Sequence, residues 1–157
     1  MKKVIKTIGI IFLLFMVIMP FIPYVVNEIC LSMFSRQISH TLPDQTQIIE
    51  LESVCGKLNG SGNSMDFCAA ALVSSSLSLQ ELTDYYSDIR YNPAKSSKYE
   101  HQPDIEIQLA ERDFQSDFLI HRQIDFSKID ELTTLEGCYI ILIYDGGYTS
   151  GFDLRGY

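Results

Sequence analysis

TQIIELESVC, residues 46–55, and DFCAAALVSS, residues 66–75, form the two arms of a predicted β-hairpin, around which the rest of the predicted fold is arranged. The segment between the arms, GKLNGSGNSM, is rich in glycine, asparagine and serine, which are typical of turns. The run of three alanines at 69–71 indicates that another element packs closely over the second arm.

The register of this hairpin follows from its apolar pattern. A two-residue turn at 61–62 places Leu51 opposite Leu72 and Cys55 opposite Cys68. A slip of one residue would scramble the apolar face that this register creates. That face consists of Ile49, Leu51, Cys55, Cys68, Ala70 and Leu72.

The segments after the hairpin predict an α+β fold. Ser78 and Glu81 form a capping box at the start of a helix over 78–90, in which apolar side chains recur every three to four residues. Short connections favour a small antiparallel sheet with this main helix packed on one face. The other predicted elements are strands at 104–111 and 118–126, a short helix at 127–137, a central strand at 138–144, and a last strand after a hairpin turn at Asp145-Gly146-Gly147. The expected order is β-β-α-β-β-α-β-β.

Residues 7–26, TIGIIFLLFMVIMPFIPYVV, predict an N-terminal transmembrane helix before this domain. The segment carries no charge, and at about 1.5 Å per residue it spans about 30 Å, the thickness of a hydrocarbon core. Lys2, Lys3 and Lys6 precede it, so the positive-inside rule places the N-terminus in the cytoplasm and the later residues outside.

A cleaved signal peptide is the alternative interpretation of the same segment. It would share the basic start and the apolar centre, but it needs small residues before the cleavage site. Residues 20–26 are bulky or cyclic instead, and the residues just before Cys30 lack the small side chains of a lipobox. We therefore expect an uncleaved anchor in the cell membrane.

The expected organisation has four parts. They are a cytoplasmic basic segment at 1–6, the transmembrane anchor at 7–26, a juxtamembrane linker at 27–45 and an extracytoplasmic α+β domain at 46–157. Of the 12 Lys and Arg residues, three precede the anchor, so nine remain against 20 Asp and Glu. Such an acidic domain is repelled by nucleic acid, and we expect no nucleic-acid partner.

Cys55 and Cys68 predict a disulfide, because the hairpin register places them opposite each other and thiols outside the cytoplasm meet an oxidising compartment. Closing a loop of about 14 residues contributes on the order of 3 kcal/mol in the chain-entropy model. A pairing of Cys55 with Cys138 is the open alternative, and Cys30 is expected to stay unpaired.

No catalytic or metal-binding motif stands out in the chain. His40, His101 and His121 are isolated, the cysteines lack a CxxC spacing, and neither a P-loop nor a nucleophile elbow is present. We therefore expect no metal and no cofactor.

Two functional hypotheses remain. The first is a non-enzymatic binding or accessory module that contacts a protein or cell-envelope partner through a polar, glycine-rich loop. The loop comprises Asn59, Gly60, Ser61, Gly62 and Asn63. The second is a small membrane-tethered hydrolase that uses His121 or His101 with a nearby carboxylate such as Asp125 or Asp104.

Overall fold

A computed structural model describes residues 2–19, 21–58, 64–96, 101–119 and 124–151, together with Asp153 and Arg155. Within these residues the chain forms three α-helices, one short 3-10 helix and four β-strands. They are α1 (Lys2–Ile18), α2 (Phe21–His40), β1 (Thr46–Gly56), β2 (Ser64–Ser75), α3 (Leu79–Ser87), β3 (Asp104–Leu109), η1 (Ser127–Glu131) and β4 (Cys138–Thr149).

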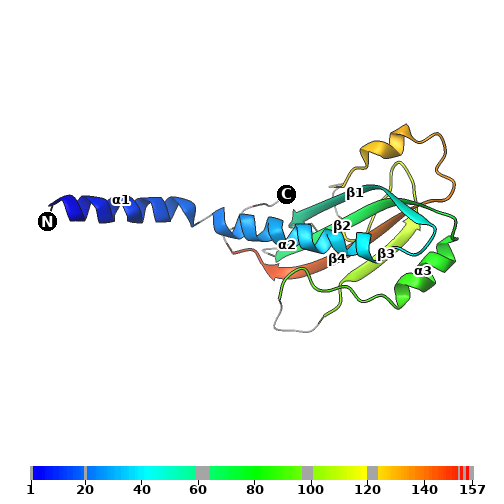
Figure 1. Ribbon diagram of the computed structural model, residues 1–157, viewed down its shortest axis with the longest axis horizontal. Coiled ribbons are helices and arrows are strands. Elements are labelled where there is room, and N and C mark those ends of the chain that lie inside the picture. Colours follow the sequence, from blue (N-terminus) through cyan, green and yellow to red (C-terminus); the bar gives the residue numbers. More distant parts are fainter. Residues whose placement is uncertain are drawn as a thin grey trace.

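The four strands form one antiparallel sheet in the order β1-β2-β4-β3 (Figure 1). The two long strands β2 and β4 are therefore central, and β1 and β3 lie at the edges. Most residues of β2 and β4 are buried on both faces, which explains why 138–144 shows no apolar–polar alternation. The predicted α+β class with a small antiparallel sheet is confirmed.

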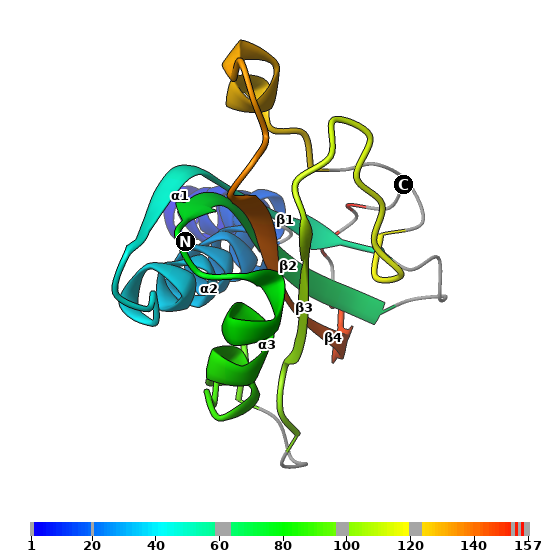
Figure 2. The same ribbon diagram turned by 90° about the vertical axis from the view of Figure 1, so that its right-hand side faces the viewer.

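Helices α2 and α3 cover one face of the sheet, and residues 110–119 and 124–135, including η1, cover the other (Figure 2). Each face has its own buried cluster. The helix-side cluster includes Leu31, Phe34 and Ile38 of α2, Leu82 and Tyr86 of α3, and Phe67, Ala69, Ala71, Ile141 and Ile143 of the sheet. The loop-side cluster includes Cys68, Ala70, Leu72, Ile140 and Leu142 of the sheet, with Phe114, Ile124, Phe126 and Ile129 packed on them.

The predicted helix over 78–90 is present as α3, which already ends at Ser87, and its capping box is confirmed. The Ser78 side chain accepts a hydrogen bond from the Glu81 backbone, and the Glu81 carboxylate accepts one from the Ser78 backbone at 2.8 Å. Leu82 and Tyr86 form the buried stripe of this helix. Sequence propensity and tertiary packing agree here.

The hairpin is confirmed, but its register differs from the prediction by one residue from Glu50 onward and by two residues before it. Val54 lies opposite Cys68, and Cys55 lies opposite Phe67, after a register shift at Ile49. The predicted register rested on the argument that a slip of one residue would disrupt the apolar face of the hairpin. Because β2 is buried on both faces, a slip of one residue still places apolar side chains in a core, so the pattern does not discriminate between the two registers.

The predicted disulfide is not formed. All four cysteines are free thiols. Cys55 belongs to the helix-side cluster, whereas Cys68 and Cys138 belong to the loop-side cluster, so either predicted pairing would have to bridge opposite faces of the sheet.

Two predicted β elements differ in the structure. The described ends of the segment 118–126 are not in a strand, and Phe118, Ile124 and Phe126 pack on the loop-side face instead. Asp145-Gly146-Gly147 does not reverse the chain, because β4 continues through it to Thr149 with a bulge opposite Asp66. Pairing along the whole of β2 outweighs the local preference for a turn.

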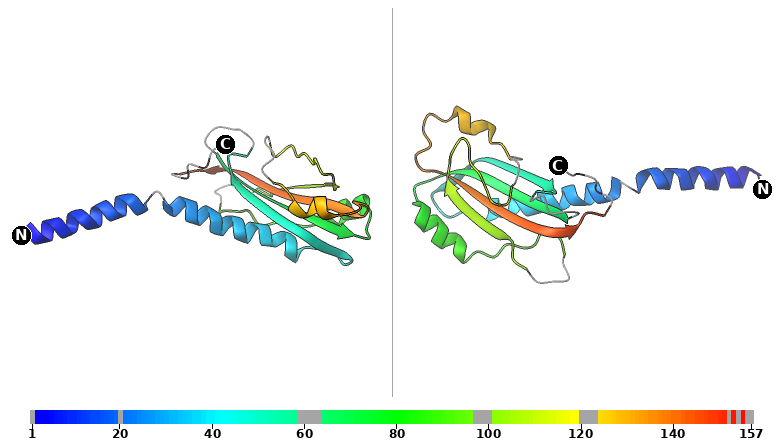
Figure 3. Two further views of the ribbon diagram at one scale, coloured as in Figure 1. Left: turned by 90° about the horizontal axis from the view of Figure 1, so that it is seen from above. Right: turned by 180° about the vertical axis from the view of Figure 1, so that it is seen from behind.

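Helix α2 extends well into the segment expected to be a linker. Its buried residues are Asn27, Leu31, Phe34, Ser35 and Ile38, so one face of this part of the helix packs in the domain core. Helix α1 extends from the N-terminal end of α2 away from the sheet (Figure 3). Pro23 falls in the first turn of α2, where its missing N–H removes no helical hydrogen bond.

No single helix among the described residues is long and apolar enough to cross a membrane. Helices α1 and α2 meet the length and composition together, with a bend of 41° between Lys6–Ile18 and Phe21–His40. The predicted segment 7–26 is therefore divided between two helices.

Phe34 tests how far the domain depends on α2. Its side chain is 1% exposed in the helix-side cluster, and Phe34→Ala is expected to lower the free energy of unfolding by about 3–5 kcal/mol. Urea unfolding of the full chain in detergent micelles, followed by circular dichroism, measures the change. Met33→Ala is the matched control, because Met33 is 66% exposed. Equal stability of the two variants would contradict the docking of α2.

Candidate functional site

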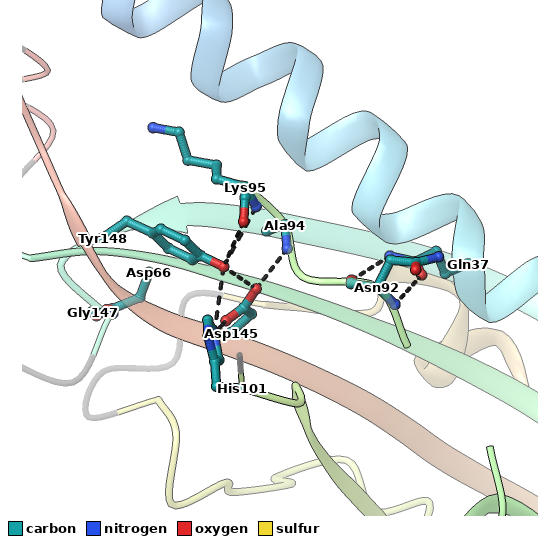
Figure 4. Close-up of polar contacts among 9 residues, drawn as sticks. All are labelled: Gln37, Asp66, Asn92, Ala94, Lys95, His101, Asp145, Gly147 and Tyr148. Atoms are coloured by element: carbon teal, nitrogen blue, oxygen red, sulfur yellow. Dashed lines mark hydrogen bonds and ion pairs between the residues drawn. The ribbon is translucent and has the colours of Figure 1, made fainter. Parts of the chain in front are cut away.

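The Asp145 carboxylate is buried where β4 bulges, and it accepts two hydrogen bonds and contacts the ring of His101 (Figure 4). The Ala94 backbone N–H donates to Oδ2 at 2.6 Å, and the Tyr148 hydroxyl donates to the same oxygen at 2.6 Å. The Nε2 of His101 contacts Oδ1. The carboxylate thus ties the segments around residues 94 and 101 to the central strand β4.

Tyr148 is hydrogen-bonded on both sides of its hydroxyl. It donates to Asp145, and the Lys95 backbone N–H approaches its oxygen at 3.5 Å. Its oxygen also lies 3.4 Å from His101 Nε2. Burial and the hydrogen bond to Asp145 raise the pKa of Tyr148 above its ordinary value, so the phenol remains a protonated donor.

Asp66 is a second buried carboxylate beside the bulge. It accepts hydrogen bonds from the backbone N–H of Leu58 at 3.2 Å and of Gly147 at 3.0 Å. A Cβ atom added at Gly146 would lie 2.6 Å from Asp66 Oδ1, and Gly147 has φ +86°. The two glycines therefore allow β4 to pass close to Asp66 while the bulge turns Asp145 toward the helix side.

A second group of polar contacts lies where α2 meets the residues after β4. Asn27, which is buried, donates to Asp153 Oδ2 at 2.6 Å. Arg155 forms an ion pair with Asp153 at 2.6 Å and another with Glu28. The guanidinium also stacks on the ring of Tyr24 at 4.2 Å, which adds a cation–π contact.

Lys95 connects the two groups. Its ammonium donates to Asn27 Oδ1 at 2.7 Å, while its backbone contacts the Tyr148 hydroxyl. The result is a continuous series of contacts that we call the polar chain. It consists of Glu28, Arg155, Asp153, Asn27, Lys95, Tyr148, Asp145 and His101.

The charges of the polar chain stabilise one another. The hydrogen bonds from Arg155 lower the pKa of Asp153 to about 2, and the same contacts raise the pKa of Arg155. Nearby, burial raises the pKa of the Cys55 thiol to about 11, which Arg155 only partly opposes. Cys55 therefore stays protonated and is a poor nucleophile.

A cleft of about 630 Å³ lies on the opposite face of the sheet, between β3 and residues 113–119. Its lining includes the carboxylates of Glu106, Asp113 and Asp117. The polar chain faces the helices, so this cleft and the His101–Asp145 pair do not share a surface.

The structure places the predicted site residues as follows. The loop Asn59–Asn63 and His121 lie outside the described residues. The loop's neighbour Ser64 pairs with Thr149, at the end of the sheet that lies near the start of α2 (Figure 1). The carboxylate that His101 contacts is Asp145, whereas the predicted partner Asp104 is exposed. Within the part of the chain that is described, no three His, Cys, Asp or Glu side chains converge to hold a metal ion.

Sequence reasoning missed Asp145, Asp153 and Arg155 as a connected set. One signal was available: Asp145 directly follows 138–144, the most apolar predicted strand, where a carboxylate must be buried with hydrogen-bond donors around it. Its partner Ala94 contributes a backbone N–H, which no side-chain pattern reveals.

The chain matched no protein-family model, no curated protein and no solved structure when it was compared with each by sequence or fold.

Asp153 gives the polar chain a measurable pH dependence. Its folded pKa of about 2 is below the ordinary value of 3.8, so its stabilising contribution is present above about pH 4 and is lost as the pH falls toward 2. We expect Asp153→Asn to lower the free energy of unfolding by about 2 kcal/mol near neutral pH, with the difference from the parent chain vanishing at about pH 2.

Denaturant unfolding at several pH values measures this difference. Asp130→Asn is the matched control, because the Asp130 side chain is 77% exposed and its ion pair with Arg112 is at the surface. A pH-independent effect of Asp153→Asn, or an equal effect of Asp130→Asn, would contradict the assignment.

Proposed function

We propose that the chain is a membrane-anchored, non-enzymatic binding or accessory module, with its α+β domain held outside the cytoplasm. The observation that carries the proposal is the apolar surface of α1 and of the first half of α2. Apart from Leu31, which is 6% exposed, the large apolar side chains from Ile8 to Met33 are between 40% and 66% exposed. Such a contiguous surface is unfavourable in water, and a bilayer would remove it from water.

The continuity of α2 supports a rigid attachment. The helix starts at Phe21, inside the apolar segment, and continues to His40 with Phe34 and Ile38 in the core. A domain on a flexible linker samples many orientations, whereas a helix shared by anchor and core restricts them. An accessory module that meets a membrane-bound partner benefits from this restriction, because less orientational freedom is lost on binding.

The polar chain supports a structural role for the buried charges. Asp145 and Asp153 each accept several hydrogen bonds from groups of the same chain. Tyr148 and Cys55, the neutral groups nearby, have raised pKa values and stay protonated. Buried charges paired in this way hold segments together, and breaking one pair is costly.

The hydrolase hypothesis has one favourable observation, the contact between His101 and buried Asp145. A carboxylate that orients an imidazole is a recurrent feature of general-base catalysis. His101→Gln distinguishes the two functions. If His101→Gln abolishes a hydrolytic activity and leaves partner binding unchanged, the hydrolase is favoured. If the chain is a binding module, neither the parent chain nor the variant is expected to hydrolyse a substrate.

Membrane attachment is tested with charged substitutions in the apolar segment. The full chain is expected to stay in the membrane fraction after alkaline carbonate extraction. A variant with Leu13→Arg and Val17→Arg is expected to become extractable, because arginine at the bilayer centre costs about 2.5–3.5 kcal/mol per residue. Leu109→Arg is the control, since Leu109 is an exposed apolar residue of the domain. An unchanged distribution of the double variant, or protection of the domain from protease added outside, would overturn the proposal.

Partner contact is tested by photo-crosslinking of the full chain in its own membrane. A photoreactive amino acid at Ser61, in the glycine-rich loop, is expected to give a defined adduct. The same group at Ser76, which is exposed at the other end of β2, is the control and is expected to give none. An adduct at Ser76 alone would contradict the assignment of the contact to residues 59–63.

A further inference from the structure

The face of α2 that points away from the sheet carries an apolar stripe. Ile22, Val26, Ile29 and Met33 recur at spacings of four, three and four residues, and each is exposed. Residues at these spacings share one face of a helix. We call these four residues the outer stripe. The buried residues of α2, including Leu31 and Phe34, lie on the opposite face.

Along α2, polar contacts begin at an earlier residue on the sheet side than on the outer face. On the outer face, the first charged residue after the stripe is Arg36, which is exposed. On the sheet side, polar contacts begin earlier, where Arg155 stacks on Tyr24 and Asn27 bonds Asp153. The apolar surface therefore extends farther along the outer face than along the sheet side.

We propose that the outer stripe is embedded in the lipid bilayer, so that the membrane surface crosses α2 obliquely and the domain leans over the membrane. This inference rests on the proposed membrane attachment and extends it beyond Val26, where the predicted span ends. The stripe continues the exposed apolar surface of α1 without a charged interruption on that face. Lipid that covers the first part of this surface can therefore also cover the outer stripe, because no charged residue lies on that face before Arg36.

The geometry of the bend fits an oblique crossing. The nine residue steps from Tyr24 to Met33 correspond to about 13 Å along the helix, compared with a helix diameter of about 10 Å. A plane that meets the sheet side near Tyr24 and the outer side near Met33 is therefore strongly inclined to the axis of α2. The bend of 41° between α1 and α2 allows α1 to lie close to the membrane normal while α2 is tilted.

The charges around residues 24–33 of α2 give no attraction to anionic headgroups, so the contact with lipid rests on the apolar side chains. Glu28, the acidic residue of α2 at this level, is paired with Arg155. The chain as a whole has a formal net charge of −8, so anionic headgroups are repelled. Zwitterionic lipid is the appropriate probe.

The chain contains no tryptophan, so a single introduced tryptophan is a clean reporter of depth. Four variants of the full chain are reconstituted in phosphatidylcholine vesicles with brominated acyl chains: Phe12→Trp, Ile29→Trp, Met33→Trp and His40→Trp. Phe12 lies in α1, and His40 lies on the same face of α2 two turns beyond Met33. Each of these side chains is exposed, so the substitutions leave the core intact.

We expect bromine to quench the fluorescence of Phe12→Trp, Ile29→Trp and Met33→Trp, with a blue-shifted emission, and to leave His40→Trp unquenched and red-shifted. Quenching of Phe12→Trp without quenching at positions 29 and 33 would overturn the oblique insertion and leave the anchor in place. A blue-shifted but unquenched Met33→Trp would also overturn it, because a second copy or another protein would then cover the stripe. Absence of quenching at Phe12 would overturn the membrane attachment itself.

Discussion

The docking of helix α2 on the sheet is the interaction on which the rest of the structure depends. Phe34 and Ile38 pack in the same cluster as Ala69 and Ala71 of the central strand β2. The small side chains allow the helix backbone to approach, and the large ones fill the space between the two layers. Because α2 is also the continuation of the apolar segment, the same contact that closes the helix-side core fixes where the apolar segment leaves the domain.

The polar chain supplements this apolar contact at the end of the sheet near α1. Charged groups are costly to bury, and they persist in a core when donors and opposite charges surround them. Here Asp145 holds the segment around Ala94 to β4, and Asp153 holds the residues after β4 to Asn27 of α2. Segments with little regular structure are thereby fixed to the two best-packed elements, and the domain gains directional contacts that apolar packing does not provide.

If the chain is membrane-attached as proposed, the placement of these contacts has a consequence for its surroundings. The polar chain and the strand end at Ser64 lie near the start of α2, so they would face the membrane surface. The opposite end of the sheet, around Ser75 and Gly137, would be the part farthest from the bilayer. An acidic domain held close to lipid in this way relies on its helix, since its net charge opposes adsorption to anionic headgroups.

The sequence by itself determined the elements whose signals are local. The capping box at Ser78, the apolar–polar alternation of β3 and the composition of the hairpin can each be recognised within a short stretch of sequence, and the α+β class followed from their order. Tertiary structure decided the features that depend on distant partners. With β2 buried on both faces, apolar pattern could not select the register, so the predicted opposition of Cys55 and Cys68 failed. The buried partners of Asp145 became visible only once the strands were paired, because a backbone N–H leaves no trace in the sequence.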